Sequence, residues 1–402
     1  QKIALPLLIG GATTSRAHTA LKIAPHHRQP VIWVKDSSRA LSVAGAVCNP
    51  EAHQDMLASI EADYRQIRER HAQKSDAKAL VTLEAARANG LRIDWSEHQA
   101  VTPQTDELLV FDDIPLQALI DTFDWTPFFQ SWELSGRYPD ILEDPIVGTQ
   151  ASALFADAKA MLERIVAEKW ITARAVVGFW KAGSDGDDVH IETASGEATL
   201  HFLRQQAQKP ESRPNLCLAD FIAPRASGKP DFIGAFAVNC GDGVDARAKA
   251  FEQALDDYSS ILLKALADRF AESCTEWLHR KVRTELWPYA ADENLGNEAL
   301  ILEQYQGIRP APGYPACPDH SEKRLLFRLL QAESSVGLHL TENFAMHPAS
   351  AVSGYYFSHP QSQYFVVGRI SREQVESYAE RKNIGLLQAE KFLAANLDYD
   401  PE

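Results

Sequence analysis

The segments Ala175-Val-Val-Gly-Phe-Trp-Lys181 and Val189-His-Ile-Glu192, with the turn Gly183-Ser-Asp-Gly-Asp187 between them, decide the fold class of this chain. β-Branched and aromatic residues favour strands in both flanking segments, and the glycines and aspartates between them favour a chain reversal. The pattern predicts an antiparallel hairpin. Further strands are expected at Ala198–Leu203 and Phe232–Val238.

Helices are expected between the strands. The strongest helical signal covers Val244–Trp287, where Leu262, Leu266 and Phe270 recur every four residues and Pro288 stops the helix. Further predicted elements are a strand at Leu108–Phe111, an aromatic-rich helix with Trp125, Phe128, Phe129 and Trp132, a helix at Gln150–Lys169, strands at Ala351–Phe357 and Tyr364–Ile370 joined by a short polar loop, and a last helix that begins with a capping box of Ser371 and Gln374. Strands in hairpins with helices among them predict an α+β domain with an antiparallel sheet and long helices.

The first part of the chain follows another pattern. The apolar runs Ile3–Ile9 and Val31–Val34 alternate with helical segments at Arg16–Ile23 and Ala40–Val47. This order predicts part of a doubly wound, Rossmann-like α/β domain with a parallel sheet. Two strands are too few for a stable sheet, and the chain begins at Gln1 without Met. We therefore expect the sequence to be a piece of a longer polypeptide.

The length of the chain indicates two domains, because its 402 residues exceed the usual limit of a single core, about 250 to 300 residues. A charged helical stretch, Glu51–His71, runs into a polar segment at residues 72–77 that presents no core face. We predict the boundary there. Residues 1–73 would form the C-terminal part of the first domain and a linker helix, and residues 74–402 the second domain.

Composition disfavours several classes of protein. The net charge of -15 disfavours binding to nucleic acid, and the longest apolar runs are well short of the roughly 18 residues that a membrane span needs. The five cysteines are odd in number and form no Cys-x-x-Cys pair, which disfavours a disulfide framework or a metal cluster and favours a reducing cytoplasm.

Common enzyme signatures are missing from the sequence. It contains no Walker loop, no Gly-x-Ser-x-Gly elbow and no complete Gly-x-Gly-x-x-Gly loop. The pair His26-His27 is more typical of a solvated loop than of a metal site, because no third ligand lies at a suitable spacing. We predict neither a catalytic side chain nor a metal site.

The most unusual segment is Arg309-Pro-Ala-Pro-Gly-Tyr-Pro-Ala-Cys-Pro318, which has four prolines in ten residues. Prolines forbid a helix here and hold the backbone extended. A stiff segment loses little entropy when a ligand binds, and its unpaired carbonyls suit an adenine or an ammonium group. The alternative interpretation, a stiff connector between helices, accounts for this segment equally well.

The longer stretch Tyr305-Gln-Gly-Ile-Arg-Pro-Ala-Pro-Gly-Tyr-Pro-Ala-Cys-Pro318 resembles the signature of the activation domain of cobalamin-dependent methionine synthases. Further segments resemble that family in the same order: Asp124-Trp-Thr-Pro-Phe-Phe129, Arg137-Tyr-Pro-Asp-Ile-Leu-Glu-Asp144, Leu218-Ala-Asp-Phe-Ile222, Asp231-Phe-Ile-Gly-Ala-Phe-Ala-Val238 and Ser353-Gly-Tyr-Tyr-Phe-Ser-His-Pro360. Upstream, Leu7-Leu-Ile-Gly-Gly-Ala-Thr-Thr-Ser15 is similar to the last element of the cobalamin-binding motif. The resemblance spans essentially the whole chain.

This resemblance implies a site for S-adenosylmethionine. The implied residues are Asp124, Glu272, Glu303, Arg309, Ala311, Tyr314, Tyr364 and Phe365. Because the ligand is a zwitterion, we expect Arg309 to hold its carboxylate and Asp124 its ammonium. Each residue has a structural alternative: Asp124 as a helix cap, Tyr364 as a core aromatic, Arg309 as a solvated cation, and both glutamates as helix-surface residues.

The resemblance also implies contacts to cobalamin. Gly10 and Gly11 are similar to the paired glycines that let the backbone approach the nucleotide tail, and Ser37 is a further expected contact. The family's Asp-x-His-x-x-Gly segment, which supplies the lower axial ligand, has no counterpart in this sequence. The homocysteine, folate and zinc regions of such enzymes also leave no trace here.

The function implied by the resemblance is reductive methylation of cobalamin. Inert cob(II)alamin takes an electron from a flavodoxin-type donor and then a methyl group from S-adenosylmethionine, and a polar hinge near Lys74 lets the domains of one polypeptide meet. This chemistry needs no side-chain acid or base, because the sulfonium already holds a good leaving group. Two alternatives stay open: a non-catalytic S-adenosylmethionine sensor, and an ordinary methyltransferase with its own acceptor.

Overall fold

The structure is a computed structural model that describes residues 6–10, 16, 19–27, 29–34, 43, 56–68, 80–210 and 212–401. The chain divides into two compact units, Gln1–Ala79 and Leu80–Glu402. The predicted boundary at residues 73 and 74 lies outside the described residues. The two-domain assignment by function therefore stays a prediction.

The first unit contains a parallel strand pair, as its sequence pattern predicts. β1 (Leu7–Gly10) pairs with β2 (Val31–Val34), and the helical turns η1 (Thr19–Ile23) and η2 (Ala24–His26) lie between them in the chain. Residues 56–68 form a helix that packs on β2, where Trp33 donates its backbone N–H to the Tyr64 hydroxyl over 2.9 Å. The predicted helix Ala40–Val47 lies almost wholly outside the described residues, and a complete doubly wound domain stays a prediction.

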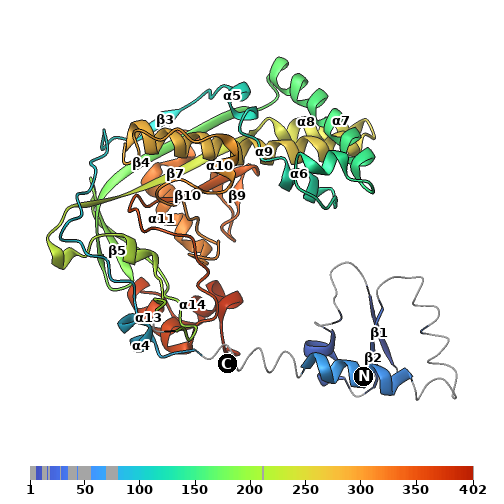
Figure 1. Ribbon diagram of the computed structural model, residues 1–402, viewed down its shortest axis with the longest axis horizontal. Helices are drawn as coiled ribbons and strands as arrows, with labels where there is room; N and C mark the ends of the chain where they lie inside the picture. The colour runs from blue at the N-terminus through green and yellow to red at the C-terminus, as the bar shows by residue number, and fades with distance from the viewer. Residues whose placement is uncertain are drawn as a thin grey trace. The chain divides into compact units, whose positions relative to one another are not determined.

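The second unit is built on an antiparallel sheet with the strand order β10-β7-β4-β5-β6, and β3 pairs with β4 beside this path (Figure 1). The strands are β3 (Leu109–Phe111), β4 (Thr172–Asp185), β5 (Asp188–Thr193), β6 (Gly196–His201), β7 (Asp231–Asp242) and β10 (Ala351–Tyr356), and a separate short pair joins β8 (His339–Leu340) to β9 (Met346–His347). The predicted hairpin is confirmed, with a tighter turn than expected at Gly186 and Asp187.

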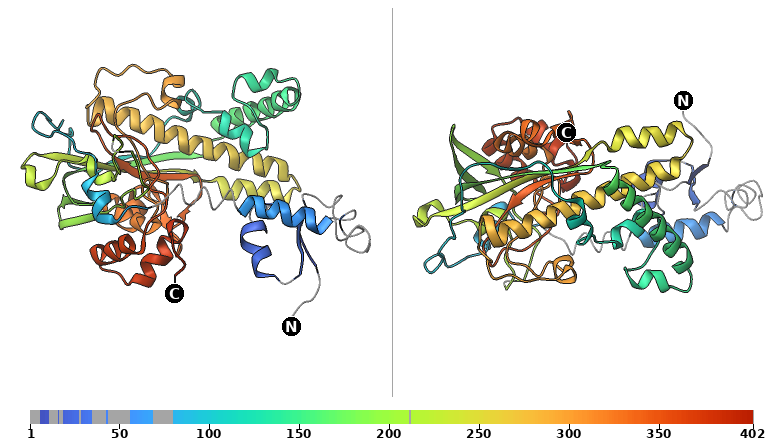
Figure 2. Two further views of the ribbon diagram at one scale, coloured as in Figure 1. Left: turned by 60° about the horizontal axis from the view of Figure 1, so that its bottom comes forward. Right: turned by 90° about the horizontal axis from the view of Figure 1, so that it is seen from above.

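Helices cover both faces of this sheet. Figure 2 shows α9 lying along one face. The helices are α4 (Leu83–Ala88), α5 (Leu116–Ile120), α6 (Thr126–Ser131), α7 (Gly148–Ala167), α8 (Val244–Gln253), α9 (Asp257–Lys281), α10 (Asn297–Ile301), α11 (Lys323–Leu330), α12 (Ala332–Val336), α13 (Arg372–Lys382) and α14 (Leu386–Phe392). Because side chains alternate along a strand, Ala175 and Val177 of β4 join the core on the α9 side, and Val176 joins the core with α11 and α12. The α+β fold class is confirmed.

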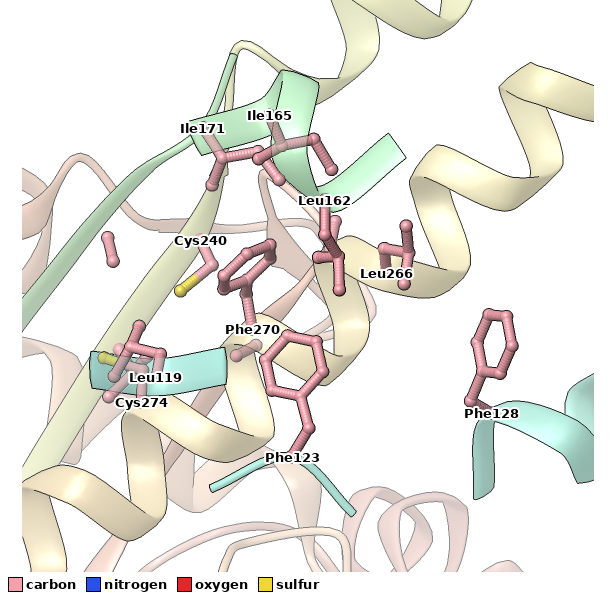
Figure 3. Close-up of a cluster of buried hydrophobic side chains, with 14 of the residues drawn as sticks. Leu119, Phe123, Phe128, Leu162, Ile165, Ile171, Cys240, Leu266, Phe270 and Cys274 are labelled. Carbon is pink, nitrogen blue, oxygen red and sulfur yellow. The ribbon is translucent and has the colours of Figure 1, made fainter. Parts of the chain in front are cut away.

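The core between the sheet, α7 and α9 contains the largest apolar cluster (Figure 3). The rings of Phe123 and Phe270 meet edge to face, with centroids 4.9 Å apart. Cys240 of β7 and Leu162 of α7 lie around Phe270 in the same cluster (Figure 3). This packing fixes α9 against β7, so the end of α9 that carries polar side chains has a defined position.

The predicted helix Val244–Trp287 is interrupted. α8 ends at Gln253, Leu255 adopts a left-handed conformation with φ of 60°, and the Asp256 side chain accepts a hydrogen bond from the Ser259 N–H over 3.0 Å. This cap starts α9 as a new helix, since a capping aspartate competes with continued helical bonding.

The predicted strand Tyr364–Ile370 is wrong. β10 pairs with β7, and the segment after residue 363 crosses the proline-rich segment, where Val367 donates its N–H to the Pro315 carbonyl over 2.8 Å. A neighbour distant in sequence therefore replaces the expected strand partner.

The predicted capping box is only half present. The Ser371 hydroxyl accepts from the Gln374 N–H as expected. The Gln374 side chain, however, donates to the Arg204 carbonyl over 3.0 Å and to the Gln206 amide oxygen over 2.7 Å, and accepts from the Arg204 N–H. Buried polar partners in the tertiary structure have drawn this amide away from the helix terminus.

Candidate ligand-binding site

A pocket of about 420 Å³ lies where α9, the β7–β10 edge of the sheet and two loops meet. Its lining residues are Phe236, Glu272, Thr275, Glu303, Arg309, Pro310, Ala311, Tyr314, Pro315, Ala316, Val352, Tyr364, Phe365 and Val366. Seven of the eight residues predicted for S-adenosylmethionine are in this set, and Asp124 is the exception. The structure therefore brings together residues from three distant parts of the sequence.

The proline-rich segment forms one wall of the pocket because it is fastened to the sheet. Ile308 and Phe357 exchange both backbone hydrogen bonds at 3.0 Å, and Tyr355 of β10 donates its N–H to the Pro310 carbonyl over 2.9 Å. Gly354 allows this approach, since a Cβ at that position would lie 2.7 Å from the Pro310 oxygen. The wall is therefore rigid for two reasons: prolines restrict its backbone, and hydrogen bonds fasten it to the sheet.

The expectation of unpaired carbonyls holds for only half of this segment, because five of its ten carbonyls accept backbone hydrogen bonds from described residues. These five carbonyls are those of Pro310, Ala311, Tyr314, Pro315 and Cys317. The tight turns that prolines and Gly313 impose direct these carbonyls back into the protein. The segment therefore offers a preformed surface and a smaller set of acceptors than its sequence predicts.

Arg309 is held at one nitrogen of its guanidinium. Nη1 lies 2.6 Å from Glu276 Oε2, 3.2 Å from His279 Nδ1 and 3.3 Å from the Tyr305 hydroxyl. Burial disfavours the charge, yet the Glu276 carboxylate outweighs this effect and holds the pKa of Arg309 above its usual value. Its side chain is only 18% exposed, which excludes the alternative of a solvated cation. Among the described residues, none accepts a hydrogen bond from Nε or Nη2.

A second buried arginine lies behind the first. Arg283 is fully buried and binds Glu293 through two bonds, Nε to Oε2 at 2.8 Å and Nη2 to Oε1 at 2.7 Å. Its Nη1 lies 3.6 Å from Glu276 Oε1, and each of these two atoms is buried without a hydrogen-bond partner in the described part of the chain. Sequence reasoning missed Glu276, His279 and Arg283, although their spacing of three and four residues places them on one helical face.

Aromatic and acidic side chains form the mouth of the pocket. Tyr314 is 59% exposed, Tyr364 is 38% exposed, and Val366 is also exposed, so Tyr364 is not the core aromatic of the alternative interpretation. The Tyr364 hydroxyl accepts from the Arg309 N–H over 3.0 Å, which ties the two loops together. Exposed aromatic faces of this kind suit stacking with a planar base or contact with a cation.

Two glutamates add negative charge to this mouth. Partial burial and the nearby Glu276 raise the pKa of Glu303, although Arg309 opposes the shift. Partial burial and the charge of Glu272 raise the pKa of Tyr314. A cationic group that enters here therefore meets two carboxylates next to aromatic rings.

Asp124 lies at the start of α6, and its Oδ1 accepts from the Thr126 N–H over 3.0 Å. This bond supports the local capping alternative, and contact between Asp124 and a ligand ammonium stays a prediction. In the first unit, Gly10 ends β1 opposite Val34, whereas Gly11 and Ser37 lie outside the described residues. Their expected contacts to cobalamin stay predictions as well.

The described residues also bear on two other classes of site. They contain no group of three or more His, Cys, Asp or Glu side chains arranged to hold a metal ion. Within the same ranges, every helix is too short or too polar to cross a membrane.

Comparison with known proteins identifies the family. The family model of the activation domain of vitamin B12-dependent methionine synthase matches residues 115–383, which is more than half of the chain. A solved structure described as the MetH reactivation domain bound to AdoHcy is 50% identical in sequence and superposes with a TM-score of 0.77. That match covers 80% of this chain and 99% of the other. This chain therefore belongs to the family of the activation domain of vitamin B12-dependent methionine synthase.

Proposed function

We propose that the unit Leu80–Glu402 binds S-adenosylmethionine in the pocket beside Arg309 and supplies its methyl group to reduced cobalamin. The single observation that carries the proposal is the open edge of Arg309 in a cavity that also holds aromatic rings and two carboxylates. The similar structure described as bound to AdoHcy supports it, because AdoHcy is what remains when S-adenosylmethionine gives up its methyl group.

Each part of the ligand has a counterpart in the pocket. The ligand carboxylate matches Nε and Nη2 of Arg309, for which the described residues offer no acceptor, because a guanidinium fork binds a carboxylate through two parallel bonds. Glu303 and Glu272 suit the ammonium and the sulfonium, and Tyr314 and Tyr364 offer faces for the adenine. Asp124 is a further proposed partner of the ammonium.

These residues position the ligand and are not needed as acids or bases. Reduced cobalamin, when bound, would supply the nucleophile that takes the methyl group. The sulfonium would leave as the neutral thioether of S-adenosylhomocysteine, so no side chain would have to give or take a proton. The exposed Tyr314 and Val366 at the mouth allow that acceptor to approach from outside the pocket.

The experiment is a calorimetric titration of S-adenosylmethionine into the chain, followed by an assay with the remaining cobalamin region and a reductant. Binding plus methylation of cobalamin supports the proposal. Binding without methyl transfer indicates a sensor, and methylation of a small acceptor without cobalamin indicates an ordinary methyltransferase. A folded chain that binds no S-adenosylmethionine rules the proposal out.

The resemblance to methionine synthases is the basis of the proposed setting. Partners are the other domains of the same polypeptide and a flavodoxin-type electron donor, in the cytoplasm and in methionine biosynthesis. Gly10, Gly11 and Ser37 would approach the nucleotide tail of cobalamin, and zinc would belong to the homocysteine region of the full enzyme.

A further inference from the structure

The guanidinium of Arg309 is bonded at one nitrogen, Nη1, and has an open edge formed by Nε and Nη2. Its three protein acceptors all face Nη1, and no described residue accepts from Nε or Nη2. The neighbouring Arg283 shows what such an edge binds, because its own Nε and Nη2 hold the Glu293 carboxylate at 2.8 and 2.7 Å. The open edge of Arg309 thus has the geometry of a carboxylate site that no described residue fills.

His279 contributes to this arrangement as a neutral acceptor. A guanidinium can only donate, so His279 Nδ1 accepts from Arg309 and the proton of the ring belongs on Nε2, which lies 3.4 Å from the Tyr289 hydroxyl. Burial and the charges of Arg283 and Arg309 lower the pKa of His279 well below its usual value, which keeps the ring neutral. Tyr356 stacks on the ring at 5.0 Å and Tyr305 meets it edge-on at 4.8 Å. The ring is therefore fixed in place.

Glu276 is fixed from the other side. Its Oε2 binds Arg309 at 2.6 Å, and its Oε1 faces Arg283, which Glu293 holds in turn. Positive and negative groups alternate along this series, so each buried charge has an opposite neighbour. Because Glu276 and His279 belong to α9 and Arg283 follows that helix directly, their positions relative to one another are set by helix geometry.

We infer that Glu276 and His279 are positioning residues, which hold Arg309 so that its Nε and Nη2 edge receives the α-carboxylate of the ligand. The pocket then selects nucleosides that carry an amino-acid tail over analogues that lack the carboxylate. This inference rests on the proposed function. It adds the reason why the pocket recognises the amino-acid tail of the ligand. Arg309 provides the contact, and the two α9 residues act through it.

The test compares two ligands by calorimetry: S-adenosylmethionine and its decarboxylated analogue. Wild type is expected to prefer S-adenosylmethionine by about 10-fold or more. Glu276→Leu is expected to weaken S-adenosylmethionine binding by about 10-fold and to change binding of the decarboxylated analogue by less than about 2-fold. Glu276→Gln keeps an acceptor for Nη1 and is expected to rescue most of the affinity.

A second variant covers the case in which Glu276→Leu does not fold. His279→Phe keeps an aromatic ring between Tyr305 and Tyr356 but removes the acceptor, and is expected to cost about 3-fold or more for S-adenosylmethionine alone. Asp187→Asn is the matched control, because it removes a buried carboxylate that pairs with Arg204 and lines no part of the pocket. It is expected to lower stability and to leave both affinities unchanged.

The outcomes separate this inference from the proposed function. Equal wild-type affinity for both ligands, or equal losses for both ligands in Glu276→Leu and His279→Phe, would overturn the positioning role and leave S-adenosylmethionine binding intact. A wild-type chain that binds neither ligand would overturn the proposed function itself.

Discussion

Two buried arginines of this chain have similar surroundings and different bonding. Arg204 donates from Nε to Asp187 at 2.7 Å, from Nη2 to Asp220 at 2.7 Å, and from Nη1 to Asp220 and to the Asn215 carbonyl. Among the described residues, the guanidinium of Arg309 finds acceptors for Nη1 alone, and it lies beside a cavity. A guanidinium with every nitrogen bonded joins parts of the fold, whereas one with an open edge at a cavity is available to a ligand.

The direction of the pKa shift does not separate the two arginines. Burial disfavours both charges, and nearby carboxylates, Asp220 and Asp187 in one case and Glu276 in the other, hold both pKa values above the usual value. What differs is how many nitrogens the protein itself satisfies. Hydrogen-bond geometry is therefore the better guide to function at buried arginines.

The largest expected effect is on stability and concerns Arg204, the structural arginine of this pair. Arg204→Ala leaves Asp187 and Asp220 buried with fewer partners, and should lower the free energy of unfolding by about 3 to 5 kcal/mol. Urea unfolding measures the change. The affinity of the folded variant for S-adenosylmethionine should stay unchanged, and a loss of affinity without a loss of stability would contradict a purely structural role for Arg204.

Asp231 extends the comparison to a buried carboxylate with no ion pair within the described ranges. It accepts from the N–H groups of Ala223 and Phe232, yet burial raises its pKa from 3.8 to about 6. Because the folded state binds the proton more tightly, this contribution to stability is complete below the unfolded pKa near 3.8 and is lost as pH rises through about 6.

The shift corresponds to about 3 kcal/mol in total, most of which is lost between about pH 4 and pH 7. Asp231→Asn should lack this dependence, so the stability of wild type relative to the variant should fall over that range. Urea unfolding at several pH values measures both proteins. Parallel pH profiles for the two would show that Asp231 titrates normally in the folded state.

The next effect concerns the functional arginine. Arg309→Ala removes the proposed fork for the ligand carboxylate and should weaken S-adenosylmethionine binding by about 2 kcal/mol or more, roughly 30-fold. Calorimetry on the folded variant measures the loss. An unchanged affinity would remove Arg309 from the site and with it the main support for the proposed function.

The smallest effect is expected at Asp124. Asparagine keeps an oxygen that accepts from the Thr126 N–H but loses the charge, so Asp124→Asn should lower S-adenosylmethionine affinity by about 1 kcal/mol if the carboxylate binds the ligand ammonium. Thermal unfolding of the same variant is the control. A shift in Tm with unchanged affinity would assign Asp124 to capping of α6 alone.

Local sequence patterns predicted much of the fold. The hairpin of β4 and β5 and the strand β2 follow from periodicity and turn residues, and the start of α13 follows from Ser371. The interruption at Leu255 and Asp256 was missed, because a capping aspartate inside a helical pattern does not show whether its side chain will compete with the helix.

Sequence alone determined the α+β class and the stiffness of the proline-rich segment. Through its resemblance to a family it also gave half of the residues that line the pocket. Only the tertiary structure decided that β10 pairs with β7, that Val367 bonds to Pro315, and that Glu276 and His279 hold Arg309. The physical reason is the separation along the sequence over which each kind of interaction acts. Helix periods and turn preferences act over a few residues, whereas the contacts that orient Arg309 join segments about 30 residues apart in the chain and form only when α9 packs on the sheet.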